Sequence, residues 1–217
     1  ITSDGAVTYI KGAPEIVMNF CSNEKIPNFA EQQSKGRRCI AFAHKVGSDI
    51  NTLSDFIWDG YVAIEDPVRS NVPDAIQAAR NAGIKVKIVT GDNPETAASI
   101  AAQANISQIP NTMLGKEVGT QTDTNLRKVD VFARTKPEDK QTLVKRFQNM
   151  GEVVAVTGDG TNDSAALNQA EVGVAMNNGT DIAKNAADVI LLDNSFPSVI
   201  LGVKWGRSLY KNIQHFI

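Results

Sequence analysis

The stretch that most constrains the fold is Thr157-Gly-Asp-Gly-Thr-Asn-Asp-Ser-Ala-Ala-Leu167, which directly follows four apolar residues, Val153-Val-Ala-Val156. This order predicts a buried strand, a sharp glycine turn and a helix that begins near Asp163. Asp159 is then carried to the carboxyl end of a strand, where open α/β sheets bind their ligands. Two carboxylates that converge there repel each other unless a cation lies between them, and hard oxygen ligands favour Mg²⁺. An Asx turn with an N-capping aspartate would account for either aspartate alone.

Composition narrows the class of protein. The chain has 217 residues, 42% of them hydrophobic, which is enough for one large or two modest cores. Its formal net charge of -2 argues against a nucleic-acid partner. Cys21 and Cys39 indicate neither a disulfide framework nor a metal site, and free thiols suit a reducing cytoplasm. We find no signal peptide and no apolar run of the ~18 residues that a membrane helix needs. The chain starts and stops in the middle of a pattern, so we expect an excised, soluble fragment.

The hydrophobic pattern changes near Asp66. Before it, weak strand patterns at 6–10, 39–43 and 56–64 surround a short helix that opens at Pro14. After it, strands expected at 84–89, 129–133, 153–156, 172–175 and 188–192 alternate with helices that open near 72, 94, 137 and 180. Repeated βα units predict an α/β fold with a doubly wound parallel sheet. The last segment, 195–217, predicts a helix that either docks on the sheet or forms a stalk toward a membrane.

Three expected strand ends carry polar turns: Asp66-Pro-Val-Arg69, Thr90-Gly-Asp92 and Thr157-Gly-Asp159. In a doubly wound sheet these ends gather at one edge. The Thr90 hydroxyl and the Gly91 amide can donate to phosphate oxygens, whereas Asp92 needs a hydrogen bond or Mg²⁺ beside a phosphate. A helix N-cap by Asp92 or Asn93 explains that turn equally well.

Two lysines and an arginine are candidate ligand-binding residues. Lys140 precedes Leu143, Val144 and Phe147 on one helical face, at the start of a helix that directly follows a strand. An ammonium there can neutralise a phosphate, although a lysine on an apolar stripe usually reaches out to solvent. Lys11 lies between a strand and a helix in Lys-Gly-Ala, where the small residues would let a flat ring approach the backbone, but a solvated turn lysine explains Lys11 better when it is considered alone. Arg38 is a candidate phosphate contact, and a strand-edge arginine explains it equally well. His44 and His215 have no companions that would make them metal ligands.

Taken together, these motifs resemble the P-type ATPases, membrane cation pumps whose phosphorylation domain is of the haloacid dehalogenase type. The resemblance runs over nearly the whole chain and includes Lys11-Gly-Ala-Pro-Glu15, Arg38-Cys-Ile-Ala41 and Ala133-Arg134 besides the three polar turns. The tail, Asp188-Val-Ile-Leu-Leu-Asp-Asn-Ser-Phe196 with Trp205-Gly-Arg-Ser-Leu-Tyr-Lys-Asn-Ile213, is most similar to calcium pumps of the plasma-membrane type.

The resemblance implies a division of the chain and a role for each motif. Residues 1–64 would be part of a nucleotide-binding domain, 65–197 the phosphorylation domain, and 198–217 the start of a stalk helix. The implied catalytic residues are Thr90, Gly91, Lys140 and Asp163, with Mg²⁺ held by Asp159 and Asp163. The implied ATP-binding residues are Lys11, Gly12, Arg38, Asp66, Arg69, Asp92, Arg134 and Asn162. The chemistry would be phosphoryl transfer from ATP to an aspartate, where charge neutralisation supplies most of the catalysis.

The sequence also departs from the family. The phosphorylated aspartate of Asp-Lys-Thr-Gly-Thr does not occur, Val68 replaces a common proline, and Ser164-Ala165 replaces Ala-Pro. We therefore expect the fragment to be inactive alone, although its parent would be an ATP-driven Ca²⁺ pump at the cytoplasmic face of a membrane. The alternatives are a stand-alone phosphatase of the same fold and a nucleotide- or Mg²⁺-binding module. An incomplete N-terminal sheet would also favour a homodimer.

Overall fold

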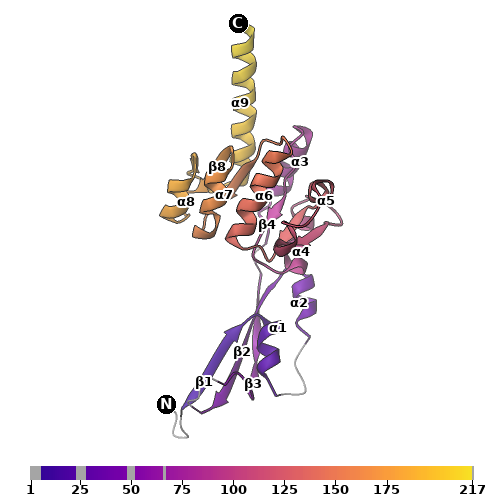
Figure 1. Cartoon of the computed structure of the whole chain (residues 1–217), viewed down its shortest axis with the longest axis vertical. Helices are drawn as coiled ribbons and strands as arrows, with labels where there is room; N and C mark the ends of the chain where they lie inside the picture. Colours follow the sequence, from indigo (N-terminus) through magenta and orange to yellow (C-terminus); the bar gives the residue numbers. More distant parts are fainter. Residues whose placement is uncertain (1–5, 23–27, 48–51, 66, 217) are drawn as a thin grey trace. The chain divides into compact units, whose positions relative to one another are not determined.

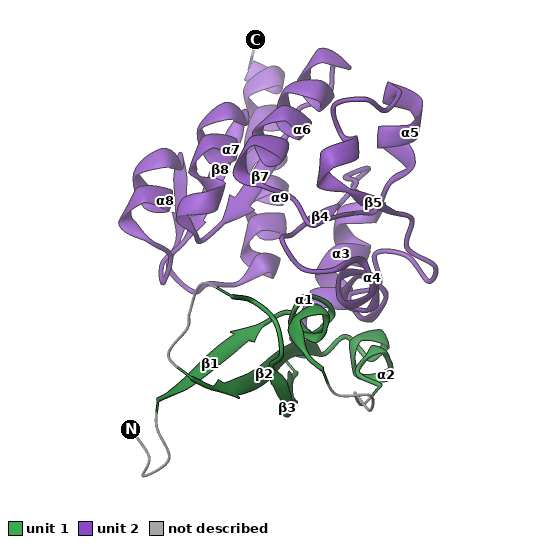
Figure 2. Ribbon diagram, turned by 60° about the horizontal axis from the view of Figure 1, so that its bottom comes forward, with its two compact units in different colours: residues 1–67 green, residues 68–217 purple. Residues whose placement is uncertain are grey.

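A computed structural model describes residues 6–22, 28–47, 52–65 and 67–216 (Figure 1). The chain divides into two compact units, residues 1–67 and 68–217 (Figure 2). The elements of the first unit are β1 (Val7–Gly12), α1 (Pro14–Val17), the 3₁₀ turn η1 (Met18–Phe20), α2 (Ala30–Ser34), β2 (Arg38–Val46) and β3 (Ile57–Ile64).

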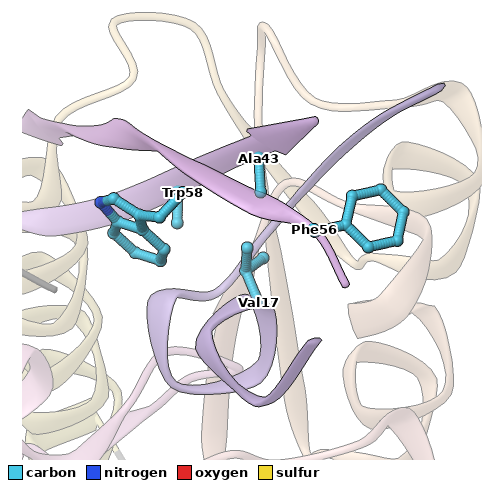
Figure 3. Close-up of a cluster of buried hydrophobic side chains, with 5 residues drawn as sticks. Val17, Ala43, Phe56 and Trp58 are labelled. Carbon is cyan, nitrogen blue, oxygen red and sulfur yellow. The ribbon is translucent and has the colours of Figure 1, made fainter. Parts of the chain in front are cut away.

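The first unit is an antiparallel sheet in the order β1-β2-β3. Its core lies on one face, where Val17 of α1 packs against Ala41, Ala43, Phe56 and Trp58 (Figure 3). Because side chains alternate along a strand, the neighbours of these alanines on β2 lie on the other face. That face is open in the described part of the unit, and Tyr9 is 72% and Val62 52% exposed there.

The second unit is the α/β part, and its elements alternate along the chain as the sequence predicts. They are α3 (Val72–Asn81), β4 (Ile88–Val89), α4 (Pro94–Gln103), β5 (Thr112–Leu114), η2 (Gly115–Glu117), α5 (Asp123–Lys128), β6 (Val131–Ala133), α6 (Pro137–Asn149), β7 (Ala155–Gly158), η3 (Thr161–Asp163), α7 (Ser164–Gln169), β8 (Val172–Met176), α8 (Asp181–Ala186), β9 (Val189–Leu191) and α9 (Phe196–Phe216).

All the strand pairs of this unit are parallel, which confirms the predicted fold class. They form two groups, in the orders β4-β6-β5 and β7-β8-β9, and no described strand pairs with both β4 and β7. β4 and β7 are therefore edge strands, although each is followed by one of the predicted ligand turns. One cluster of buried residues includes Phe132 of β6 and Leu143 of α6, together with Val118, Leu126 and Val129.

Three local predictions were wrong in detail. The strand expected at 153–156 runs instead from Ala155 to Gly158, and Val153 is 84% exposed. The Val154 amide is bound at 2.8 Å by the Glu171 carboxylate rather than by a neighbouring strand. β4 covers only the last two residues of the predicted 84–89, since it has one partner strand. Lys11 lies within β1 rather than in a turn, because pairing with β2 continues to Gly12.

The last helix, α9, extends as one long helix away from the rest of its unit (Figure 1). Its first turns are half-buried, and Arg207 donates a hydrogen bond to the carbonyl of Ala82 at the end of α3. Farther on, Trp205, Leu209 and Ile213 are 70%, 62% and 49% exposed. Across the described stretches, no helix combines the length and the apolar character that crossing a bilayer requires.

Candidate functional site

The turn after β7 is built around the side chain of Asp163. A Cβ on Gly158 would lie 2.5 Å from the Asp163 Cβ and 2.9 Å from its Oδ2. Gly158 is therefore required by this close approach rather than by an unusual φ angle. The Oδ2 atom of Asp163 accepts a hydrogen bond from the Gly160 amide at 3.3 Å, so the carboxylate closes the turn from which it projects.

Lys140 contacts this turn from the first part of α6. Its Nζ atom lies 2.6 Å from Oδ1 of Asp163, and the two side chains are only 16% and 17% exposed. α6 begins at Pro137, and the Asp139 carboxylate accepts from the Lys136 amide at 2.8 Å, which fixes the first turn of the helix. The lysine therefore faces the turn instead of reaching out to solvent, and the ion pair connects the β6–α6 connection with the turn after β7.

The Thr90-Gly-Asp92 turn follows β4. The Thr90 hydroxyl accepts from the Asp92 amide at 3.1 Å and lies 3.2 Å from the Asp92 carboxylate, to which it can donate. Asn93, rather than Asp92, caps α4, because its Oδ1 accepts from the Thr96 amide at 2.8 Å. A Cβ on Gly91 would come no nearer than 3.9 Å to another atom, so sterics do not require glycine at that position.

Sequence reasoning missed Thr135, which joins two strand ends. Thr135 is 8% exposed, and both its amide and its hydroxyl donate to the Thr90 carbonyl, at 3.0 and 2.9 Å. Beside it, the Arg134 amide donates to the Asp92 carbonyl at 2.9 Å while Arg134 holds a left-handed φ of 51°. The available signal was a threonine in the short connection between a strand, which ends at Ala133, and a helix, which begins at Pro137. These bonds bring the turn after β4 to the residues that lead into α6 and Lys140.

Asp159 and Asn162 lie in the same turn as Asp163, and both are exposed. The backbone carbonyl of Asp159 accepts from the Thr180 amide at 2.8 Å. Among the residues that the structure describes, no group of three or more His, Cys, Asp or Glu side chains could hold a metal ion. Asp159 and Asp163 offer two hard oxygen donors, which suit Mg²⁺ if water and a bound phosphate complete its octahedral shell.

The remaining predicted ligands are distributed over both units. In the first unit, Lys11 is paired with Phe42, and Arg38 lies four residues earlier on β2, so the three side chains share the open face of the sheet. A Cβ on Gly12 would lie 3.4 Å from the Val17 side chain, which is an ordinary van der Waals contact, so packing does not require glycine there. Asp66 lies outside the described residues. Arg69, in the second unit, donates to the Asn194 carbonyl at 2.7 Å.

Comparisons with known proteins agree with this architecture. A model of the haloacid dehalogenase-like hydrolases matches residues 8–171. Calcium-transporting ATPase 5, plasma membrane-type, of Oryza sativa subsp. japonica is 38% identical over 95% of this chain and 23% of its own length. Calcium-transporting ATPase 8, plasma membrane-type, of Arabidopsis thaliana is 37% identical over 100% of this chain and 24% of its own length.

A bacterial relative is similar to the same extent. Calcium-transporting ATPase 1 of Lactococcus lactis subsp. lactis (strain IL1403) is 37% identical over 96% of this chain and 27% of its own length. The chain thus spans about a quarter of the length of the curated relatives that it matches. The family match agrees with the parallel α/β unit and with the polar turns at its strand ends. The chain belongs to the haloacid dehalogenase-like hydrolases, and nearly all of its own length is similar to plasma-membrane-type calcium-transporting ATPases.

Proposed function

We propose that this chain is the cytoplasmic phosphorylation unit, with part of the nucleotide-binding unit, of an ATP-driven cation pump, and that its cargo is Ca²⁺. The ion pair of Lys140 with Asp163 is the observation that carries this proposal. It joins a cation to a candidate metal ligand at the carboxyl end of a parallel strand, where α/β folds bind phosphates. The names of the relatives support the choice of Ca²⁺.

In this proposal each residue has a chemical role. The Thr90 hydroxyl and the Gly91 amide donate to the oxygens of the transferred phosphoryl group, and the Lys140 ammonium neutralises its charge. Asp159 and Asp163 would hold Mg²⁺, which when bound supplies further positive charge to the phosphate oxygens. Thr135 keeps Thr90 in place through its two hydrogen bonds to the Thr90 carbonyl. Phosphoryl transfer needs little more than this positioning and charge neutralisation.

The acceptor of the phosphoryl group would come from elsewhere in the parent protein. Asp-Lys-Thr-Gly-Thr does not occur in this sequence, and β4 and β7 are edge strands whose turns carry Thr90 and Asp159. Unpaired strand edges are templates for pairing with another strand. We infer that a strand of the parent ends beside these turns and presents the acceptor aspartate, so the chain alone neither forms an aspartyl phosphate nor hydrolyses ATP.

The open face of β1-β2-β3 is the proposed adenine and phosphate contact of the first unit. Lys11 lies opposite Phe42, and Arg38 lies about 13 Å along the strand from Phe42, from a rise of ~3.3 Å per residue. The Phe42 ring, with the Lys11 ammonium beside it, suits a nucleotide base, and the Arg38 guanidinium at the other end suits a phosphate. Gly12, Asp66, Arg69, Asp92, Arg134 and Asn162 are the further proposed nucleotide contacts.

Two contact surfaces are also proposed, one in the isolated chain and one in the parent. The edge strands β1 and β3 would favour a homodimer of the isolated chain, which sedimentation would detect. The exposed stripe of Leu201, Trp205 and Leu209 on α9 would pack against the membrane-bound part of the parent.

The decisive experiment measures Mg²⁺ binding to the purified chain by calorimetry. We expect weak binding that disappears in Asp159→Asn and is unchanged in Asp74→Asn, a control at an exposed aspartate of α3. Equal binding in wild type and Asp159→Asn would refute the metal site. A parallel assay of ATP hydrolysis should show none, and turnover by the purified chain would refute the requirement for an outside acceptor.

The alternative enzyme is a stand-alone phosphatase. Asp159 is the only aspartate followed two positions later by aspartate or threonine, as Asp159-Gly-Thr161. If Asp159 were itself a nucleophile, the chain would hydrolyse p-nitrophenyl phosphate without ATP, and Asp159→Asn would abolish that turnover. The pump proposal predicts no such activity.

A further inference from the structure

The connection between β8 and α8, residues 177–180, lies directly on the backbone of Asp159. The Thr180 amide donates to the Asp159 carbonyl at 2.8 Å. A Cβ on Gly179 would lie 3.0 Å from that same carbonyl oxygen and 3.1 Å from the Asp159 Cα. The two backbones are therefore in close contact, and a methyl group on Gly179 would be tighter than ordinary packing and would push the Asp159 backbone by a few tenths of an ångström. The φ angle of Gly179 is an ordinary one, so the close approach is what favours glycine here.

Asn194 holds this 177–180 loop from its other side. The Asn194 Oδ1 atom accepts from the Asn178 amide at 3.1 Å, and the Asn177 amide donates to the Leu191 carbonyl at 3.0 Å. Asn194 has a left-handed φ of 52°, a conformation that asparagine tolerates better than most residues. Its carbonyl also accepts from Arg69, so its position is fixed by both its side chain and its backbone.

The same short segment begins α9. The Asp193 carboxylate accepts from the Ser198 hydroxyl at 2.5 Å and from the Ser195 amide at 3.1 Å. The hydrogen bond from Ser198 lowers the pKa of Asp193, because it stabilises the ionised carboxylate. A continuous set of contacts thus runs from the start of α9 through Asn194 and the 177–180 loop to the turn that carries Asp159.

We propose that Asn194 and Gly179 are positioning residues for Asp159, which they hold through the 177–180 loop. This inference rests on the proposed function of Asp159 as an Mg²⁺ ligand. A ligating carboxylate binds well only if its backbone is fixed, and residues that orient metal ligands typically affect affinity ~10- to 100-fold. Neither Asn194 nor Gly179 touches the metal, so both act through the Asp159 backbone.

The test compares four variants of the whole chain by Mg²⁺ calorimetry. Asn194→Gly keeps the left-handed backbone but removes the acceptor for the Asn178 amide, whereas Asn194→Asp keeps both. Gly179→Ala places a methyl group against Asp159, whereas Gly119→Ala places one in open space. We expect Asn194→Gly and Gly179→Ala to weaken Mg²⁺ binding ~10-fold, and the other two variants to match wild type. Equal affinity in all four, or equal loss in Asn194→Asp, would overturn the proposal.

A second measurement does not depend on metal. Hydrogen exchange of the Thr180 amide in the metal-free chain reports its bond to the Asp159 carbonyl directly. We expect faster exchange of this amide in Asn194→Gly than in Asn194→Asp, with the core amide of Phe132 unchanged as a control. If Asp159→Asn does not alter Mg²⁺ binding, the proposed metal site fails, yet this exchange still decides the positioning role. An unchanged Thr180 rate in Asn194→Gly would refute it.

Discussion

The ion pair between Lys140 and Asp163 allows a quantitative prediction, because both side chains are about five-sixths buried at a separation of 2.6 Å. With an effective dielectric constant of about 20, the direct attraction is about 6 kcal/mol. Desolvation of the two charges and ordering of the lysine cancel most of it. We therefore expect a coupling free energy of about 2 kcal/mol from a double-mutant cycle of Lys140→Met and Asp163→Asn, near the upper end of measured pairs.

Urea unfolding followed by far-ultraviolet circular dichroism measures this coupling. The long helices lie in the second unit, so the helical signal reports its unfolding, while fluorescence of the buried Trp58, measured in a Trp205→Phe background, reports the first unit. With a slope of about 2 kcal/mol per molar urea, each 2 kcal/mol moves the midpoint by about 1 M.

The pair Arg127–Glu152 provides the control, since it lies in the same unit with side chains 41% and 45% exposed. Arg127→Met with Glu152→Gln should give a coupling below about 1 kcal/mol, as exposed pairs do. If the Lys140–Asp163 coupling does not exceed that of the control pair, burial does not strengthen this interaction and the reasoning fails.

Three further predictions follow from packing and protonation. Gly158→Ala forces a methyl group to within 2.5 Å of the Asp163 Cβ and should lower the free energy of unfolding in urea by about 1–3 kcal/mol. The control Gly119→Ala places its methyl group in open space and should leave that free energy almost unchanged, so equal losses would contradict the close-contact argument. Phe132→Ala leaves a cavity at a fully buried position and should lower the free energy of unfolding by about 3–5 kcal/mol in the same assay. A loss under about 1 kcal/mol would mean that the neighbouring side chains fill the cavity. Burial lowers the pKa of Lys87, so between the folded and unfolded pKa values the unfolded chain binds more protons and stability rises with pH. Lys87→Met should remove that rise, and unfolding curves from neutral to alkaline pH that stay parallel to wild type would refute it.

Periodic features of the chain could be predicted from the sequence. The α/β class could be predicted after Asp66 because the helices there have apolar residues every three to four positions and alternate with short apolar strands. The position of Lys140 followed from its spacing to Leu143 and Val144, which fixed the face that it shares with them.

Non-periodic contacts could not be predicted. Thr135 binds a carbonyl 45 positions away, and Asn194 binds an amide 16 positions away; neither bond leaves a repeat in the sequence. The exposed Val153 was assigned to a buried strand because an apolar run does not reveal which strands have a neighbour on each side. The roles assigned to the site residues remain predictions.

Both carboxylate oxygens of Asp163 already accept a hydrogen bond, one from the Lys140 ammonium and the other from the Gly160 amide. If Asp163 binds Mg²⁺ as proposed, the ion would draw electron density from a carboxylate that already accepts two hydrogen bonds, and its attraction for Lys140 would weaken. The Lys140 ammonium could then attract an anion more strongly, so binding of the metal and binding of the anion would favour each other. Thermodynamic reciprocity requires the same factor in both directions, and the two ligands would bind this turn as cooperative partners.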